Sequence, residues 1–217
     1  MTIAVLAAMG MEAARLRERI ENAEPMAPRG KTVRGAVGAA AVILHRCGWG
    51  MRNAARGARA VIENYHPDAL VLCGVSGGLL PNIRVGETFI ASSAFPAWGK
   101  AREAFATDAK LADFAARVLE GARQSPVATS RGLILRKKRK LGVVLQSGAA
   151  CIDMESWAVA KTAQEMGVPL LILRAISDTY RPSSLLAFFK NGALAAEKAA
   201  ADTEAVLKKL AEGAQDG

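Results

Sequence analysis

Short apolar runs alternate with amphipathic stretches along the 217 residues of the chain. The continuous apolar runs at 2–8, 69–79 and 169–177 predict buried strands. Apolar positions in 51–65 recur at helical spacing, and the HPD that follows predicts the end of that helix. Strands without polar alternation are typical of a sheet that helices cover on both faces. We therefore expect the α/β class, built as a three-layer α/β/α sandwich.

The same reasoning places the other elements. The stretch GVSGG at 74–78 is predicted to be a glycine-rich turn at the end of a strand. We see no repeat, low-complexity segment or linker, and expect one domain over 1–217. Further helices are expected at 10–23, 108–122, 136–147, 155–166 and 183–212, further strands at 86–95 and 149–154, and a hairpin that turns near Gly38 at 30–48.

Composition favours a soluble protein. The chain is 51% hydrophobic, but its apolar runs fall short of the roughly 20 residues that cross a bilayer. Its first residues lack the basic start of a signal peptide. The three cysteines are odd in number and have no metal-binding spacing, which favours free buried thiols. We expect a cytoplasmic protein without a metal.

The net charge of +9 makes nucleic acid a hypothesis to test. Basic residues are scattered apart from RKKRK at 136–140, and no aromatic residue interleaves with that cluster as base stacking requires. A solvated, basic start of a helix is the favoured interpretation, so we expect no nucleic-acid partner. Attraction to anionic membrane lipids or to a phosphorylated ligand stays open.

Acidic residues follow several of the predicted strands, and in α/β sheets ligands bind at strand ends. Glu12, Asp153, Glu155 and Asp178 occupy such places. Each also has a plainer interpretation, as a first-turn helix acid, a cap or a turn residue. Arg174 lies inside the apolar run LLILRAIS and needs a carboxylate or an anionic ligand as its partner.

Together these residues suit cleavage of a glycosidic bond. Acids and one arginine can stabilise a cation, activate water and protonate a leaving group. The two histidines are isolated, and neither a GxSxG elbow nor the Lys-Ser/Thr of a phosphate-binding P-loop is present.

Four stretches of the sequence stand out together, in the order IAVLAAMGMEAARL, RCGWGMRNAARGARAVIE, PDALVLCGVSGGLLPNIRVGETFIAS and IDMESWAVAKTAQEMGVPLLILRAISD. In this order they resemble the purine and uridine phosphorylase superfamily, most closely its nucleosidase branch, which includes the methylthioadenosine/S-adenosylhomocysteine nucleosidases. The resemblance implies a nucleoside phosphorylase-like fold with a central mixed sheet and cleavage of an adenosine-type nucleoside.

The resemblance also implies roles for individual residues. Glu12 is similar to the carboxylate that positions the attacking water, and Asp178 to the residue that protonates N7 of the purine. Glu155, beside Met154, matches the residue that holds the ribose hydroxyls. Arg174 resembles the arginine near the water or, in phosphorylases, the phosphate. The turn that lines the ribose site corresponds to Val75, Ser76 and Gly77.

One part of the chain departs from the nucleosidase pattern. The SGDxF stretch, whose backbone and phenylalanine hold the purine, is missing from 130–148. In this respect the chain is similar to the hopanoid-associated phosphorylase subgroup, which is linked to removal of adenine from a lipid-borne nucleoside. That resemblance implies peripheral contact with a membrane, and the superfamily as a whole implies a homodimer.

Hydrolysis and phosphorolysis differ in the nucleophile. Phosphate binding requires several cationic groups, for which Arg174 and Arg52 are candidates, whereas Glu12 would repel the anion. We therefore expect hydrolysis without a cofactor, and phosphate becomes a co-substrate only if the reaction is phosphorolytic. The alternative to an enzyme is a non-catalytic nucleoside-binding protein, against which the presence of Asp178, Glu12 and Glu155 argues.

Overall fold

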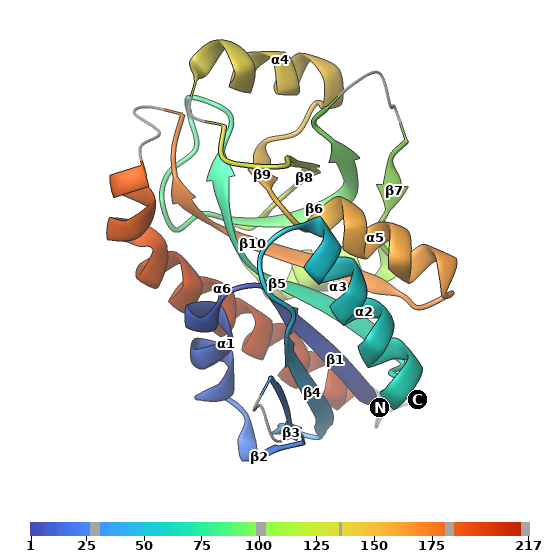
Figure 1. Ribbon diagram of the computed structural model, residues 1–217. Coiled ribbons are helices and arrows are strands. Elements are labelled where there is room, and N and C mark those ends of the chain that lie inside the picture. The colour runs from blue at the N-terminus through green and yellow to red at the C-terminus, as the bar shows by residue number, and fades with distance from the viewer. Residues whose placement is uncertain (27–30, 99–102, 135, 181–184, 214–217) are drawn as a thin grey trace.

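The computed structural model describes residues 1–26, 31–98, 103–134, 136–180 and 185–213, with the side chains of 185 and 187 excepted. A mixed sheet lies between two helical layers (Figure 1). The α/β class and the sandwich architecture are confirmed. Helices α1 (Gly10–Arg17) and α6 (Leu185–Gly213), with α3 (Ala109–Val118) packed beside α6, cover one face, and α2 (Met51–Tyr65) and α5 (Ser156–Glu165) cover the other.

Strand β1 (Thr2–Ala7) lies between two parallel neighbours, β4 (Ala40–Arg46) and β5 (Ala69–Gly78). Both of its faces are covered by helices, which explains why its residues are apolar without alternation. Antiparallel strands β3 (Thr32–Val37) and β2 (Glu21–Pro25) extend the sheet beyond β4.

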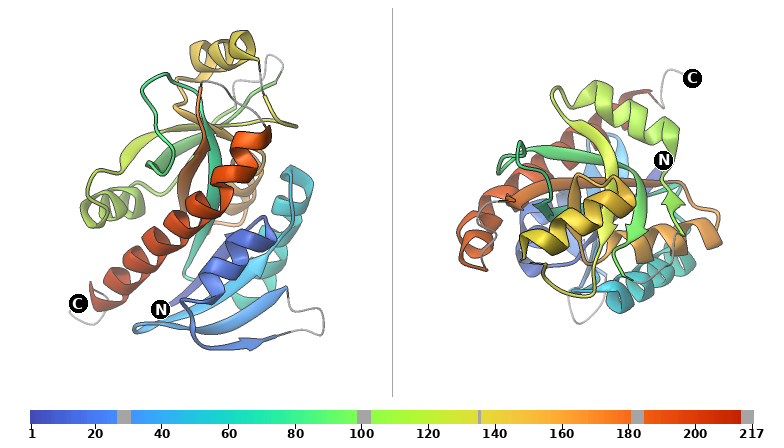
Figure 2. Two further views of the ribbon diagram at one scale, coloured as in Figure 1. Left: turned by 90° about the vertical axis from the view of Figure 1, so that its left-hand side faces the viewer. Right: turned by 90° about the horizontal axis from the view of Figure 1, so that it is seen from above.

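The other half of the sheet closes on itself. The pairings run from β5 to β10, β6, β8 and β9, and then back to β5. The ends of β5, β9 and β10 therefore meet at one place, and α4 lies over this end of the molecule (Figures 1 and 2). The bounds are β6 (Thr88–Pro96), β8 (Arg123–Thr129), β9 (Cys151–Asp153), β10 (Leu170–Asp178) and α4 (Lys137–Ser147), and β7 (Phe105–Ala106) pairs with β6.

Several expected elements need correction. The helix expected over 10–23 ends at Arg17, because Glu21–Pro25 pairs with β3 as an edge strand. The GVSGG stretch is not a turn but the last part of β5, where it pairs with β10 and β9. Strands β7 and β8 were not predicted. The helix expected over 51–65 has those bounds, and the hairpin turns at Gly38, whose φ is 58°.

The core has two parts. The larger part fills the space between the sheet and the helices, whereas a smaller cluster under α4 contains Leu79, Ala128, Val143, Ala149 and Ile152. Helix α4 thus rests on a small core of its own. The three cysteines, Cys47, Cys73 and Cys151, are free and buried. Within the described ranges, no helix is long and apolar enough to cross a membrane.

Candidate active site

A cavity opens where β5, β9 and β10 end beside the start of α1. The charged side chains in its described lining are Glu12, Asp153, Glu155 and Asp178. These carboxylates come from three segments of the chain: the first turn of α1, the end of β9 with the residue before α5, and the end of β10. Two of the predicted residues, Arg174 and Arg52, are not in this lining; Arg174 is buried behind it and Arg52 is exposed on α2.

Glu12 is buried and its carboxylate accepts three backbone hydrogen bonds. Oε2 accepts from the N–H groups of Ala8 and Met9 at 3.0 and 2.7 Å, and Oε1 accepts from the N–H of Val75 at 2.8 Å. Burial raises the pKa of Glu12, while the charge of Arg174 and these backbone donors act in the opposite direction. A carboxylate has about four acceptor positions, so one remains for a water molecule.

Gly74 lies between Glu12 and Arg174. A Cβ at this position would lie 2.4 Å from Glu12 Oε1 and 2.6 Å from Arg174 Nη1. Only a residue without a side chain lets the acid and the arginine approach the strand backbone this closely. The glycines of the GVSGG stretch thus serve close packing within a strand rather than a turn.

Glu155 connects the start of α5 to the loop before α2. Its Oε1 accepts from the N–H of Gly50 at 2.7 Å, and its Oε2 accepts from the N–H of Met154 at 3.2 Å. Burial, and after it the charge of Asp153, raises the pKa of Glu155 to about 7. The side chain therefore changes charge near neutral pH.

Arg174 forms a buried ion pair with Asp153, and their Nη2 and Oδ2 atoms are 2.5 Å apart. Asp153 also accepts from the hydroxyl of Thr129 at 2.8 Å and from the N–H and hydroxyl of Ser156 at the start of α5. Burial disfavours the charge of Arg174, but Asp153, Glu155 and Glu12 raise its pKa. Asp153 is therefore the carboxylate partner that a buried arginine in this strand needs.

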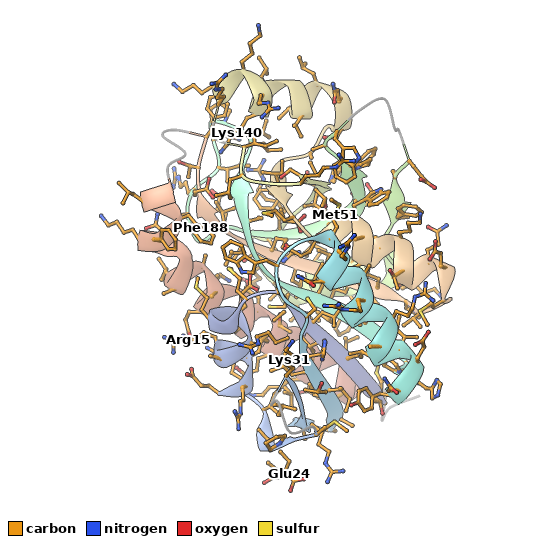
Figure 3. The ribbon with its side chains drawn as sticks, in the orientation of Figure 1. Arg15, Glu24, Lys31, Met51, Lys140 and Phe188 are labelled. Carbon is orange, nitrogen blue, oxygen red and sulfur yellow. The ribbon has the colours of Figure 1, made fainter. Side chains whose placement is uncertain are left out.

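Asp178 is the last residue of β10 and lies beside Lys140. Lys140 belongs to the basic run 136–140, which the sequence predicts to be a solvated start of a helix. Lys140 Nζ is 3.5 Å from Asp178 Oδ2, and the lysine side chain is only 1% exposed. The Ser177 hydroxyl lies 3.3 Å from Asp178 Oδ1. Burial lowers the pKa of Lys140, and Asp178 counters this. The basic run 136–140 gave no signal that its last residue points inward (Figure 3).

The rest of the lining is mostly apolar, with Ser76 and Ser177 as its uncharged polar residues. Met154 and three residues predicted to lie on the ribose-site turn, Val75, Ser76 and Gly77, belong to the lining. So do several residues that the sequence did not point to, among them Trp49, Leu133 and Phe188. Trp49 and Phe188 meet edge to face, with ring centroids 6.3 Å apart. Leu133 comes from the stretch 130–148 that departs from the nucleosidase pattern. An aromatic residue between two glycines, as in GWG, was the available signal for Trp49.

The chain belongs to the phosphorylase superfamily. The model of that family matches residues 2–211.

Solved structures share this fold over almost their whole length. A 5′-methylthioadenosine/S-adenosylhomocysteine nucleosidase from S. pneumoniae is 21% identical with a TM-score of 0.90, covering 97% of this chain and 100% of that one. The corresponding nucleosidase from Neisseria meningitidis is 25% identical with a TM-score of 0.86 and coverage of 96% and 99%. A futalosine hydrolase of Helicobacter pylori is 19% identical with a TM-score of 0.88 and coverage of 96% and 97%.

Proposed function

We propose that the protein hydrolyses the N-glycosidic bond of an adenosine-type nucleoside and releases adenine. One observation carries the proposal: in the described lining of the cavity, every charged side chain is a carboxylate. Cleavage of this bond develops positive charge on the ribose, which nearby carboxylates stabilise more in the transition state than in the ground state. An ionised Glu12 repels a phosphate dianion, which favours water as the nucleophile.

In the proposed reaction, Glu12 holds a water molecule and takes one of its protons. The water oxygen forms a bond to C1′ of the ribose as the bond from C1′ to N9 breaks, and the bonding electrons move to the purine. Asp178 gives its proton to N7 of the purine, so adenine leaves as a neutral molecule. The products are adenine and the free sugar.

Glu155 and Arg174 support the two residues that transfer protons, Glu12 and Asp178. Glu155 has acceptor positions beyond the two backbone hydrogen bonds that it receives, and we assign these to ribose hydroxyls. Arg174 lies behind Glu12, and its charge opposes the effect of burial on the pKa of that acid. The predicted contact of Arg174 with water or phosphate stays a prediction, because the arginine is paired with Asp153 outside the described lining.

The apolar side of the cavity favours a substrate with an apolar 5′ substituent, and we include a lipid-linked nucleoside in the proposal. Trp49 is 50% exposed although it lines the cavity. Phe188 continues this wall onto α6, where Leu186 and Phe189 are exposed at 80% and 65%. This surface suits a long apolar tail and peripheral contact with a membrane. A homodimer is also proposed, on the resemblance to the superfamily alone.

The test is incubation of the purified protein with 5′-methylthioadenosine, with and without inorganic phosphate. We expect adenine and a free sugar at rates independent of phosphate, and a rate of product formation in D178N that is lower by about 10²–10⁴-fold. Formation of a sugar 1-phosphate would show that the reaction is phosphorolysis and would contradict hydrolysis. Binding of adenine by isothermal titration without turnover of any adenosine-type nucleoside would favour the non-catalytic nucleoside-binding protein.

A further inference from the structure

We propose that Lys140 is a positioning residue for the proton donor Asp178, so that α4 takes part in the reaction. This inference rests on the proposed function. The geometry that carries it is the meeting of one lysine of α4 with the ends of two strands. Lys140 Nζ donates to the carbonyl oxygens of Gly78 and Thr179 at 3.1 and 3.2 Å, and it lies 3.5 Å from Asp178 Oδ2.

These contacts give the ammonium group two hydrogen bonds and one ion pair. A lysine ammonium has three N–H donors, and here two carbonyl oxygens and one carboxylate surround it. A lysine that is 1% exposed needs such partners, since a buried charge without them is costly. The other basic residues of the run, at 136–139, are exposed, so the inward direction is particular to Lys140.

The position of Lys140 also fixes the Asp178 carboxylate from the side away from the cavity. Asp178 is in the lining of the cavity, whereas Lys140 is not. The ammonium lies near Oδ2, and the Ser177 hydroxyl lies 3.3 Å from Oδ1. A Cβ on Gly77 would lie 3.1 Å from Oδ1, so the backbone of β5 closes a third side. The carboxylate therefore has little freedom to turn away from a base in the cavity.

The ammonium acts on the reaction through this carboxylate. When Asp178 gives its proton to the leaving purine, a negative charge develops on the carboxyl group. Lys140 is already in place to face that charge, and a fixed charge of this kind requires no reorganisation during the reaction. Lys140 would thus lower the barrier to proton transfer without touching the nucleoside, and its loss would change kcat rather than KM.

The experiment is a double-mutant cycle on 5′-methylthioadenosine cleavage with K140M, D178N and K140M/D178N. K138M, at an exposed position of the same helix, is the matched control. We expect K140M to lower kcat by about 10-fold or more, which is part of the roughly 10²–10⁴-fold contribution of general acid catalysis. KM should change little, K140R should recover part of kcat, and K140M should have no further effect in the D178N background.

The results separate the positioning role of Lys140 from the proposed function. Equal loss of kcat from K140M with and without Asp178, or wild-type kcat in K140M, overturns the positioning role. K140Q, whose amide can still donate to a carbonyl, replaces K140M if circular dichroism shows that K140M does not fold. A wild-type protein that cleaves no adenosine-type nucleoside overturns the proposed function and this inference with it, whereas an active wild type beside an unaffected K140M overturns the inference alone.

Discussion

Arg174 and Asp153 form an ion pair behind the cavity, with 2.5 Å between Nη2 and Oδ2. The side chains of both are 1% exposed. This pair fastens the start of α5 to β10, because Asp153 also accepts from the N–H of Ser156. The carboxylate of Glu155, one residue before α5, depends on this arrangement for its place in the cavity.

Loss of one partner of this pair should destabilise the fold. A buried charge left alone typically costs about 3–5 kcal/mol. We expect R174M and D153N each to lower the free energy of unfolding by an amount of that order, measured by urea denaturation. R59M, at an exposed position of α2, should change it by less than about 1 kcal/mol. Equal effects in R174M and R59M would contradict a structural role for the buried pair.

Glu155 should make stability fall as pH rises. Its pKa is raised from 4.5 to about 7 in the folded chain, so between these values the folded chain holds a proton that the unfolded chain has lost. Stability from this group is therefore present at low pH and is lost as pH rises towards 7, by an amount on the order of 3 kcal/mol. Urea denaturation across this range should show a smaller decrease in E155Q than in the wild type.

The matched control for that experiment is E120Q, because Glu120 is exposed. Its decrease should equal that of the wild type. Glu12 adds a decrease of the same sign, since its pKa is also raised, so the difference between wild type and E155Q carries the result. Parallel pH curves for these two proteins would show that Glu155 does not titrate in this range.

The same group should make substrate affinity depend on pH. Ribose hydroxyls donate more strongly to an ionised carboxylate than to a neutral carboxyl group. We therefore expect KM for 5′-methylthioadenosine to fall as pH rises through about 7, the pKa of Glu155. Initial rates on both sides of this pH test the expectation. In E155Q, KM should be higher and nearly constant, and a wild-type KM that rises over this range would refute the assignment.

Substitution of Gly74 should remove activity through packing alone. In G74A the new methyl group would lie within 2.6 Å of both Glu12 Oε1 and Arg174 Nη1, so both charged groups must move. We expect a loss of kcat of about 10²-fold or more together with a lower melting temperature. G142A is the control, because a Cβ on Gly142 meets nothing within 4 Å and alanine favours the helix by about 0.5–1 kcal/mol.

Under the proposed function, Trp49 should determine how the protein responds to the 5′ substituent of its substrate. If the apolar wall holds a tail, kcat/KM should rise as the alkyl chain of a series of 5′-alkylthioadenosines lengthens. Each buried CH₂ contributes about 0.8 kcal/mol at most. W49A should flatten this series while it leaves the methylthio substrate less affected. W157A serves as a second aromatic substitution, because the indole N–H of Trp157 donates to the Glu103 carbonyl at 3.0 Å. Equal flattening in W49A and W157A would contradict a specific role of Trp49 in holding the tail.

Much of the fold could be predicted because the pattern of apolar residues was strong. The apolar residues of α2 recur at helical spacing. Strand β1 is apolar without alternation because helices cover both of its faces. Edge strand β2 and the polar first half of β8 carry no such pattern, since pairing with neighbouring strands decides their conformation. The glycines of 74–78 were misread as a turn, because close approach of side chains and a turn both select glycine.

The acids of the site could be predicted because strand ends converge in such sheets. Lys140 could not, because its burial depends on two carbonyl oxygens and a carboxylate that are remote in the sequence. A basic run indicates a solvent-exposed segment unless the positions of these oxygen acceptors are known. Phe188, labelled in Figure 3, gave no signal in the sequence for the same reason, since only the packing of α6 brings it to Trp49.

The small core under α4 attaches this helix to the ends of β5 and β9, because Val143 packs there with Leu79 and Ile152. It is separate from the larger core between the sheet and the helices. Exposed positions of α4 can therefore be exchanged without a change to either core, which makes this helix a tolerant place for new surface chemistry. In such a redesign, a lysine facing the end of β10 is the feature to retain.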